Sequence, residues 1–202
     1  MAAEVGVFFG LWLRKPRDLA AAVPSGPFLA DALGRHVTRD RPGYVLELGA
    51  GTGSITRGLL RTGCPASRLV VIEREPALAQ FIRRNLPGVT VIEGDATRLR
   101  PLLLEQGISQ LACAVSSLPI KWFSLDDQQA IVTQAFSLLG AGGSLLQVTN
   151  ALSSPLPSKR LGLEAKEVER IWLNFLPAQV WRYRLKEQTG TAGSGHRNGG
   201  DA

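Results

Sequence analysis

Short apolar runs alternate with amphipathic stretches along most of this 202-residue chain. The runs have the length of buried strands, and each is followed by a turn signal or a helical pattern. The predicted strands span 44–48, 69–72, 89–92, 111–115 and 144–149. The predicted helices span 28–37, 53–61, 76–86 and 126–139. This alternation predicts an α/β fold, with a doubly wound parallel sheet and helices on both faces.

The pattern changes after residue 150. Two further strands are predicted over 164–173 and 179–186, joined by a short connection. Strands joined this closely must be antiparallel, so the sheet is predicted to end in a hairpin. In the last strand, apolar and basic residues alternate and give one face of each kind. These residues are Trp181, Arg182, Tyr183, Arg184, Leu185 and Lys186.

The two ends of the chain differ from its middle. Residues 1–23 carry large apolar side chains at helical spacing, followed by Arg14 and Lys15. Aromatic groups beside cations suit a helix that lies on an anionic membrane, although a helix packed on its own domain has the same pattern. Residues 188–202 are polar and are predicted to be a disordered tail. We therefore expect a membrane-docking helix over 1–23, a main domain over 24–187 and the tail.

Charge and cysteine content narrow the function classes. The net charge of +6 favours an anionic partner, either nucleic acid or an anionic membrane surface. Cys64 and Cys113 lack metal-ligand spacing and are predicted to be reduced thiols; with only two histidines, no metal site is expected. No apolar run reaches the roughly 18–20 residues of a membrane span, and no signal peptide pattern is evident. The default expectation is a cytosolic protein that can visit a membrane.

Three glycines at alternate positions follow the first predicted strand: Gly49, Gly51 and Gly53. Glycines there allow a sharp turn and a close approach of the backbone to a ligand. Dinucleotide-binding loops read G-x-G-x-x-G, but here the third glycine comes one residue early. Glu47 lies just ahead, where it suits a cationic group better than an anionic pyrophosphate. A nucleoside with a positively charged, amino-acid-like tail fits best, and S-adenosylmethionine has both parts.

Two more acids follow the next two strands. Glu73 ends the second strand, where its carboxylate could accept both ribose hydroxyls of a nucleoside. Asp95 follows the third strand and could accept the adenine amine, while the Ala96 amide donates to a ring nitrogen. The alternatives are a solvated loop carboxylate at Glu73, a capping role for Glu47 and a turn residue at Asp95.

The stretch Glu47–Gly53 resembles motif I of the class I S-adenosylmethionine-dependent methyltransferases, and the Asp95 segment resembles their adenine-contacting motif. The resemblance covers about residues 44–186. It implies a Rossmann-like seven-stranded methyltransferase sheet, mostly parallel, whose last strand is antiparallel. It also implies S-adenosylmethionine as cofactor and S-adenosylhomocysteine as product. The candidate cofactor residues are Ser25, Glu47, Gly49, Ala50, Gly51, Thr52, Gly53, Glu73, Arg74, Asp95, Ala96 and Ser116.

Two subfamilies share this form of motif I, the rRNA adenine dimethyltransferases and the bacterial phospholipid N-methyltransferases. Enzymes that methylate adenine carry, after the fourth strand, Asn or Asp, then Leu or Pro, Pro and an aromatic residue that stacks on the flipped base. This sequence has Ser117-Leu118-Pro119-Ile120 instead, which resembles the phospholipid enzymes. Further stretches that resemble them are 8–16, 24–27, 161–163 and 174–184.

The resemblance implies successive N-methylation of phosphatidylethanolamine to its monomethyl and dimethyl forms, with phosphatidylcholine as a further product to test. The backbone carbonyls of Ser116, Ser117 and Leu118 are predicted to orient the amine, while solvent takes its proton. Tyr183 is a further candidate for headgroup binding, and a core role is its alternative. Substrate or membrane contacts are expected at Phe8, Phe9, Trp12, Arg14, Lys15, Lys159, Arg160, Arg182 and Arg184.

The implied enzyme is cytoplasmic and peripheral on the inner face of the cytoplasmic membrane. The partners expected are an anionic phospholipid membrane and the lipid substrate; no stable protein partner is implied, and nucleic acid is disfavoured. An RNA (adenine) or protein methyltransferase is the alternative enzyme. A cofactor-binding module without turnover is the non-catalytic alternative.

Overall fold

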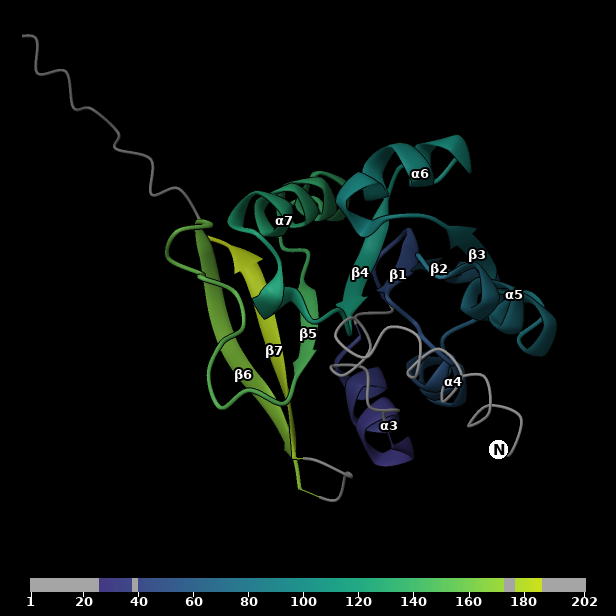
Figure 1. Ribbon diagram of the computed structural model, residues 1–202, viewed down its shortest axis with the longest axis horizontal. Coiled ribbons are helices and arrows are strands. Elements are labelled where there is room, and N and C mark those ends of the chain that lie inside the picture. Colours follow the sequence, from purple (N-terminus) through teal and green to yellow (C-terminus); the bar gives the residue numbers. More distant parts are fainter. Residues whose placement is uncertain (1–25, 38–39, 173–176, 187–202) are drawn as a thin grey trace, which may run out of the picture.

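A computed structural model describes residues 26–37, 40–172 and 177–186 of the chain (Figure 1). Seven strands form one sheet in the order β3-β2-β1-β4-β5-β7-β6. They are β1 (Tyr44–Leu48), β2 (Leu69–Glu73), β3 (Thr90–Glu93), β4 (Leu111–Ser116), β5 (Leu145–Thr149), β6 (Leu163–Ile171) and β7 (Ala178–Leu185). Strands β1 to β5 are parallel, and β7 is antiparallel to both β5 and β6. The predicted sheet and its closing hairpin are confirmed.

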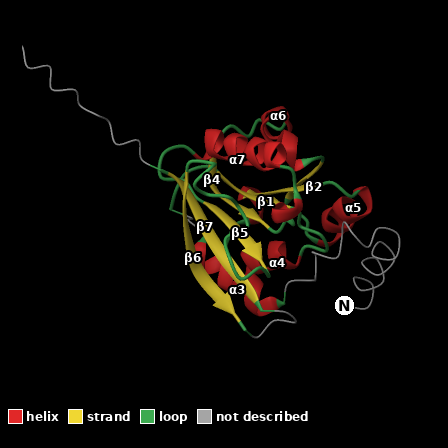
Figure 2. Cartoon of the chain, turned by 60° about the vertical axis from the view of Figure 1, so that its left-hand side comes forward, coloured by secondary structure: helices red, strands yellow, loops and turns green. Residues whose placement is uncertain are grey.

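Helices cover both faces of the sheet (Figures 1 and 2). The α-helices are α3 (Pro27–His36), α4 (Ser54–Arg61), α5 (Pro76–Asn85), α6 (Leu99–Glu105) and α7 (Leu125–Leu139). Three short 3₁₀ helices are η1 (Ala66–Arg68), η2 (Ala96–Arg98) and η3 (Ile120–Trp122). Residues near the N-termini of α5 and α7 explain where these two helices begin. Pro76 opens α5 at a position where its missing amide is tolerated, and Ser124 Oγ caps α7 by accepting the Asp127 amide at 3.1 Å.

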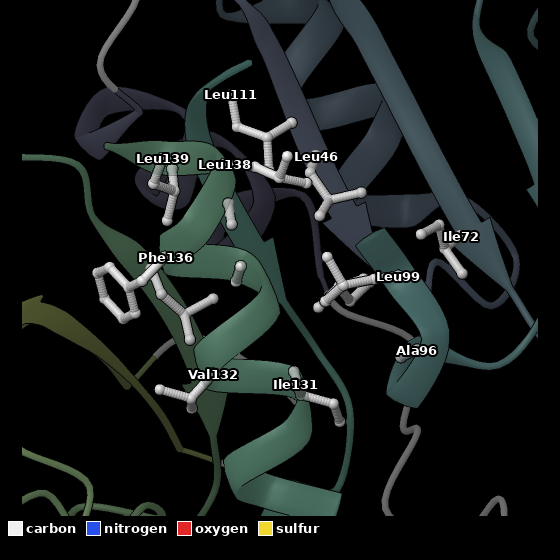
Figure 3. Packing of buried hydrophobic residues seen from close by; sticks show 14 of the residues in the cluster. Leu46, Ile72, Ala96, Leu99, Leu111, Ile131, Val132, Phe136, Leu138 and Leu139 are labelled. Carbon is white, nitrogen blue, oxygen red and sulfur yellow. The ribbon is translucent and has the colours of Figure 1, made fainter. Parts of the chain in front are cut away.

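The core is divided by the sheet into two layers. On one face, α6 and α7 contribute Leu99, Ile131 and Phe136 to a buried cluster that also contains Leu46 and Ile72 of the sheet (Figure 3). On the other face, buried side chains of α3 and α4 pack against the opposite side of the same strands. Each large apolar side chain buried in this way contributes about 1.5–3 kcal/mol. Burial on both faces explains why the parallel strands are continuous apolar runs.

The carboxyl ends of several strands meet at one edge, which we call the carboxyl edge. Strands β1 to β5 end there, and β6 does too, because it runs antiparallel to β7. The described residues that follow the strands at this edge are 49–53, 74–75, 94–98, 117–124, 150–152 and 172. The rest of the connection after β5 leads to the start of β6 at the opposite edge, where Leu163 pairs with Leu185. Open parallel sheets bind their ligands at such an edge. Within the described residues, none of the helices combines the length and the apolar character needed to cross a bilayer.

Candidate active site

The glycine loop turns the chain from β1 into α4. Gly49, Gly51 and Gly53 all have positive φ, at 73°, 57° and 78°. At Gly49, an added Cβ would lie 2.6 Å from the Leu118 side chain, so a larger residue would be both strained and crowded. At Gly51, apart from the glycine and its two neighbours in the chain, no described atom lies within 4 Å of where a Cβ would be, so the backbone borders open space. The loop therefore leaves its middle open for a ligand to approach.

Glu73 holds this loop in place from the end of β2. One of its carboxylate oxygens, Oε2, accepts the Gly51 amide at 2.9 Å, and the other, Oε1, accepts the Glu75 amide at 3.0 Å. An ionised carboxylate has about four acceptor positions, so each oxygen retains one more. The structure thus places Glu73 beside the open part of the glycine loop, with capacity for two further donors.

Glu47 is fully buried on β1 and faces α4. Neither of its carboxylate oxygens has a hydrogen-bond partner among the residues that the structure describes. Burial raises the pKa of Glu47 to about 7, an effect that the Thr56 hydroxyl and amide partly oppose and the Glu73 charge reinforces. The Thr56 groups act through proximity, because the geometry of a hydrogen bond is not met. An unpaired buried carboxylate is costly, and a cationic ligand group would relieve that cost.

Asp95 caps the short helix η2 at the carboxyl end of β3. Its Oδ1 accepts the Thr97 amide and the Thr97 hydroxyl, each at 2.8 Å. The hydrogen bond from the Thr97 amide lowers the pKa of Asp95, and the nearby Arg74 charge acts in the same direction. Asp95 is thus held as a carboxylate at the carboxyl edge, while the adjacent Ala96 is buried in the core. The capping role shows that Asp95 also has a structural function.

The segment after β4 is tied to both of its neighbours. Ser117 Oγ donates to the Gly49 carbonyl oxygen, and Ser116 Oγ accepts the Leu118 amide at 3.3 Å. The Leu118 carbonyl accepts two donors, the Ile120 amide at 2.7 Å and Gln147 Nε2 of β5 at 2.9 Å. This carbonyl was predicted to orient the substrate amine, but both of its lone pairs are engaged in the fold. Its role is therefore to fix the segment beside the glycine loop.

Gln147 was not found from the sequence. It is buried in β5 beside Ser116, and its Oε1 has no hydrogen-bond partner within the described part of the chain. Its Nε2 also donates to the Val148 carbonyl at 2.7 Å. No sequence signal distinguishes it from other glutamines; only the pairing of β4 with β5 brings it to the active-site segment.

Tyr183 lies in the core and not at the carboxyl edge. Its side chain is fully buried between β7 and the 150–162 segment, and its hydroxyl bonds Ser154 Oγ at 2.7 Å and accepts the Leu156 amide at 3.4 Å. Burial raises the pKa of Tyr183, so the phenol stays neutral. Tyr183 is therefore a core residue, and the prediction that it binds the headgroup is wrong.

The predicted cations fall into two groups. Lys159 and Arg160 are exposed in the segment between β5 and β6, and Arg184 is exposed on β7. Arg182 is half-buried, and its Nη2 lies 3.3 Å from Nδ1 of His36, whose Nε2 lies 2.8 Å from Glu169 Oε2. Arg182 therefore joins α3 to the closing hairpin. The remaining predicted residues lie outside the described part of the chain: Phe8, Phe9, Trp12, Arg14, Lys15 and Ser25.

Residues 45–143 match a family model described as a methyltransferase domain. The chain is also 32% identical over 146 residues to an ornithine lipid N-methyltransferase from Singulisphaera acidiphila, an alignment that covers 71% of this chain and 76% of that enzyme. The chain belongs to the S-adenosylmethionine-dependent methyltransferases. The predicted family and cofactor are thereby confirmed.

Two further methyltransferases resemble this chain, one over a shorter stretch and one at lower sequence identity. A ribosomal RNA small subunit methyltransferase A from Afipia carboxidovorans is 42% identical over 79 residues, which cover 37% of this methyltransferase and 27% of that enzyme. The structure of a Burkholderia thailandensis 1,6-didemethyltoxoflavin-N1-methyltransferase aligns with a TM-score of 0.62 and 16% identity, over 92% of this chain and 89% of that one. This likeness shows a common fold. The glycine loop, with Glu47, Glu73 and Asp95, remains the predicted cofactor site of this methyltransferase.

Proposed function

We propose that this methyltransferase transfers methyl groups to the primary amine of a membrane lipid headgroup, with phosphatidylethanolamine as the substrate. The observation that carries the lipid class is the relative named an ornithine lipid N-methyltransferase, which aligns with 71% of the chain. The Ser117-Leu118-Pro119 segment supports the same reading, because it has the form seen in phospholipid N-methyltransferases. Monomethyl and dimethyl phosphatidylethanolamine are the expected products.

Three acids would hold the cofactor. Glu47 would neutralise its cationic amino-acid end, Glu73 would accept the ribose hydroxyls, and Asp95 would accept the adenine amine. The buried, unpaired carboxylate of Glu47 and the two remaining acceptor positions of Glu73 support these assignments. When bound, S-adenosylmethionine supplies an electrophilic methyl group.

The amine must lose a proton before it can act as a nucleophile, and it must be held in line with the bond that breaks. His36 is the one histidine in the described ranges, and it is paired with Glu169 and Arg182. We therefore assign the proton to solvent. The backbone after β4, which the hydrogen bond from the Leu118 amide to Ser116 Oγ holds in place, is proposed to orient the amine through its carbonyl groups at residues 116 and 117.

Adenine methylation in RNA is the second candidate, because a ribosomal RNA methyltransferase is 42% identical over 79 residues. Two features of the site disfavour it. Ser117 stands where adenine methyltransferases have Asn or Asp, and its hydroxyl is engaged with the Gly49 carbonyl. Ile120 stands where they have an aromatic ring, and its side chain is buried in the core. Neither residue could receive a flipped base.

Labelled cofactor offered with separate acceptors tests the proposal. Vesicles with phosphatidylethanolamine, vesicles with ornithine lipid and an RNA transcript would be incubated with the enzyme, and the products separated by thin-layer chromatography. Label in mono- and dimethyl phosphatidylethanolamine is the expected result. Label in ornithine lipid alone would overturn the phosphatidylethanolamine assignment, and label in RNA alone would overturn the lipid class. We further propose that the enzyme works as a peripheral protein on the inner face of the cytoplasmic membrane.

A further inference from the structure

Strands β1, β4, β5 and β7 align one residue each in a row across the sheet. Leu48 of β1 pairs with Ser116 of β4, and Ser116 pairs with Gln147 of β5. Trp181 of β7 pairs with Gln147 from the other side. Paired residues point to the same face of a sheet, and Leu48 belongs to the core cluster that includes the buried face of α7. Since neighbouring strands lie about 4.8 Å apart, Gln147 is roughly 10 Å from the strand that enters the glycine loop.

The side-chain amide of Gln147 is held in one orientation. Its nitrogen, Nε2, donates to the Leu118 carbonyl at 2.9 Å and to the Val148 carbonyl at 2.7 Å, which uses both of its hydrogens. Rotating the amide by half a turn would place Oε1 against two carbonyl oxygens, so the nitrogen and the oxygen cannot exchange places. Oε1 is thereby directed away from both carbonyls, and it has no partner among the residues that the structure describes.

The neighbours of Gln147 in the row do not supply a donor to Oε1. The Trp181 indole N–H donates to Gln179 Oε1 at 3.0 Å. On the other side, Ser116 Oγ accepts the Leu118 amide. Gln147 is only 1% exposed, so bulk water does not reach it. A buried carbonyl oxygen without a donor is unfavourable in the free protein, and a ligand that carries an N–H group would relieve this cost.

The segment after β4 offers few other acceptors to an amine. Adenine methyltransferases carry Asn or Asp at the position of Ser117, and the oxygen of either side chain can accept a hydrogen bond. Here the Ser117 hydroxyl donates to the Gly49 carbonyl, and the Leu118 carbonyl already has two donors. Gln147 instead brings an amide oxygen to the same segment from the next strand of the sheet.

We propose that Gln147 Oε1 accepts one N–H of the lipid amine, and that this contact limits the enzyme to two methyl transfers. The inference rests on the proposed function. A neutral primary amine carries two N–H bonds and one lone pair, and the lone pair must point at the methyl carbon. Two fixed acceptors determine that direction: Oε1 on one side, and a backbone carbonyl at residue 116 or 117 on the other.

Each transfer removes one N–H bond from the headgroup. The nitrogen forms a bond to the methyl carbon as the carbon–sulfur bond of the cofactor breaks, and the resulting ammonium releases one proton to solvent. The monomethyl amine keeps one N–H, so a single acceptor still holds it. The dimethyl amine has none, and it would leave Gln147 Oε1 unpaired against methyl groups. Sites that hydrogen-bond an N–H group strongly reject analogues that lack it.

Short-chain ethanolamine lipids below their micelle concentration, with no, one or two N-methyl groups, test the proposal with the full chain. The wild type should act on the dimethyl lipid with a kcat/KM at least about 100-fold below that for the monomethyl lipid. Gln147→Leu should lower the ratio of kcat/KM for the unmethylated lipid to that for the monomethyl lipid by about tenfold, because the first step loses one of its two acceptors. Relative to the monomethyl lipid, the dimethyl lipid should become a better substrate of this variant.

Gln147→Glu and Gln128→Leu are the matched variants. Gln147→Glu keeps an oxygen in the place of Oε1 and loses the amide donor to Leu118, so it should slow all three lipids while the ratio stays close to that of the wild type. Gln128→Leu removes an unpaired buried oxygen that lies on α7 and not in the row, and it should leave the ratio unchanged.

Two outcomes would overturn this inference alone. One is an equal loss on every lipid in Gln147→Leu, which would reduce Gln147 to a support of the segment; the other is wild-type turnover of the dimethyl lipid equal to that of the monomethyl lipid. A wild type that binds S-adenosylmethionine but methylates no ethanolamine lipid would overturn the proposed function, and this inference with it.

Discussion

The carboxyl edge of this methyltransferase has two halves with opposite chemistry. The half after β1, β2 and β3 carries Glu47, Glu73 and Asp95 around a tight glycine loop. The half after β4, β5 and β6 carries the exposed apolar side chains of Trp122, Leu152 and Trp172. The first half suits a small cationic nucleoside, and the second presents apolar groups. Under the proposed function, the second half lies on the side from which the lipid acceptor approaches.

Glu73→Ala should have the largest effect on the acidic half. The change removes the proposed ribose acceptors and leaves the Gly51 amide without its partner, and charge-assisted hydrogen bonds contribute about 1.5–3 kcal/mol each. Cofactor affinity, measured by calorimetry, should fall by at least about 100-fold. Glu75→Ala is the matched control, because the Glu75 contact to Glu73 uses its backbone amide, which the substitution keeps. Unchanged affinity in Glu73→Ala would overturn the ribose assignment.

Glu47 should make the stability of the cofactor-free enzyme depend on pH. Its pKa is about 7 in the folded protein, against 4.5 for an ordinary glutamate side chain, so the folded protein binds more protons between these values. The free energy of unfolding should therefore fall as pH rises from 4.5 to 7, by roughly 3 kcal/mol. Urea denaturation at pH 5 and pH 8 measures this, and Glu47→Gln should remove most of the difference. A wild-type profile no steeper than that of Glu47→Gln would contradict the buried, unpaired carboxylate.

The same residue should link cofactor binding to proton release. A cationic ligand group favours ionised Glu47, so affinity should rise with pH between about 6 and 8. Calorimetry in two buffers of different ionisation enthalpy would show up to one proton released at pH 6. Absence of a buffer dependence there would place the cationic end of the cofactor elsewhere.

Gln147 donates a hydrogen bond to the segment beside the glycine loop, and its substitution should have an intermediate effect on turnover. Gln147→Leu removes the donor to the Leu118 carbonyl, so the segment beside the glycine loop loses one of its anchors. Small displacements near reacting groups are costly, and kcat should fall about tenfold with cofactor affinity nearly unchanged. Gln128→Leu is a matched control, since Gln128 is also a buried glutamine that donates to a carbonyl of the same connection, that of Phe123. Equal kcat values for the two variants would remove the positioning role.

Tyr183→Phe should have the smallest effect. The phenol loses its hydrogen bonds to Ser154 and Leu156, which costs about 1 kcal/mol of unfolding free energy, while the ring still fills the core. Turnover on a short-chain lipid should stay close to wild type. A large loss of kcat with unchanged stability would instead show that Tyr183 contributes directly to substrate binding or catalysis.

Much of the fold followed from the sequence because parallel strands buried on both faces are readable as continuous apolar runs. Every described strand was predicted to within about two residues at each end. Helix α6 was missed: it has seven residues, and Pro101 lies within its first turn. The sequence also placed Glu47, Glu73 and Asp95 at or near the carboxyl ends of three neighbouring strands, since the order of the strands alone brings these ends together.

Long-range contacts were beyond the sequence. The alternation of residue types placed Tyr183 and Arg182 on opposite faces of the last strand. It could not show that Tyr183 hydrogen-bonds Ser154 or that Arg182 contacts His36. Gln147 reaches Leu118 only because β5 pairs with β4. The exposure of Trp122 likewise depends on Ile120 and Phe123 turning inward. These contacts arise from tertiary packing, for which neither spacing nor residue type gives a signal.

Whether the acceptor is a lipid amine can be tested in a bacterial host that makes phosphatidylethanolamine but no methylated lipids. Mass spectrometry of its lipid extract would compare cells that express the wild type with cells that express Glu73→Ala. We expect mono- and dimethyl phosphatidylethanolamine with the wild type and neither with the variant. An unchanged lipid profile with wild-type protein that is folded and binds S-adenosylmethionine would contradict this expectation.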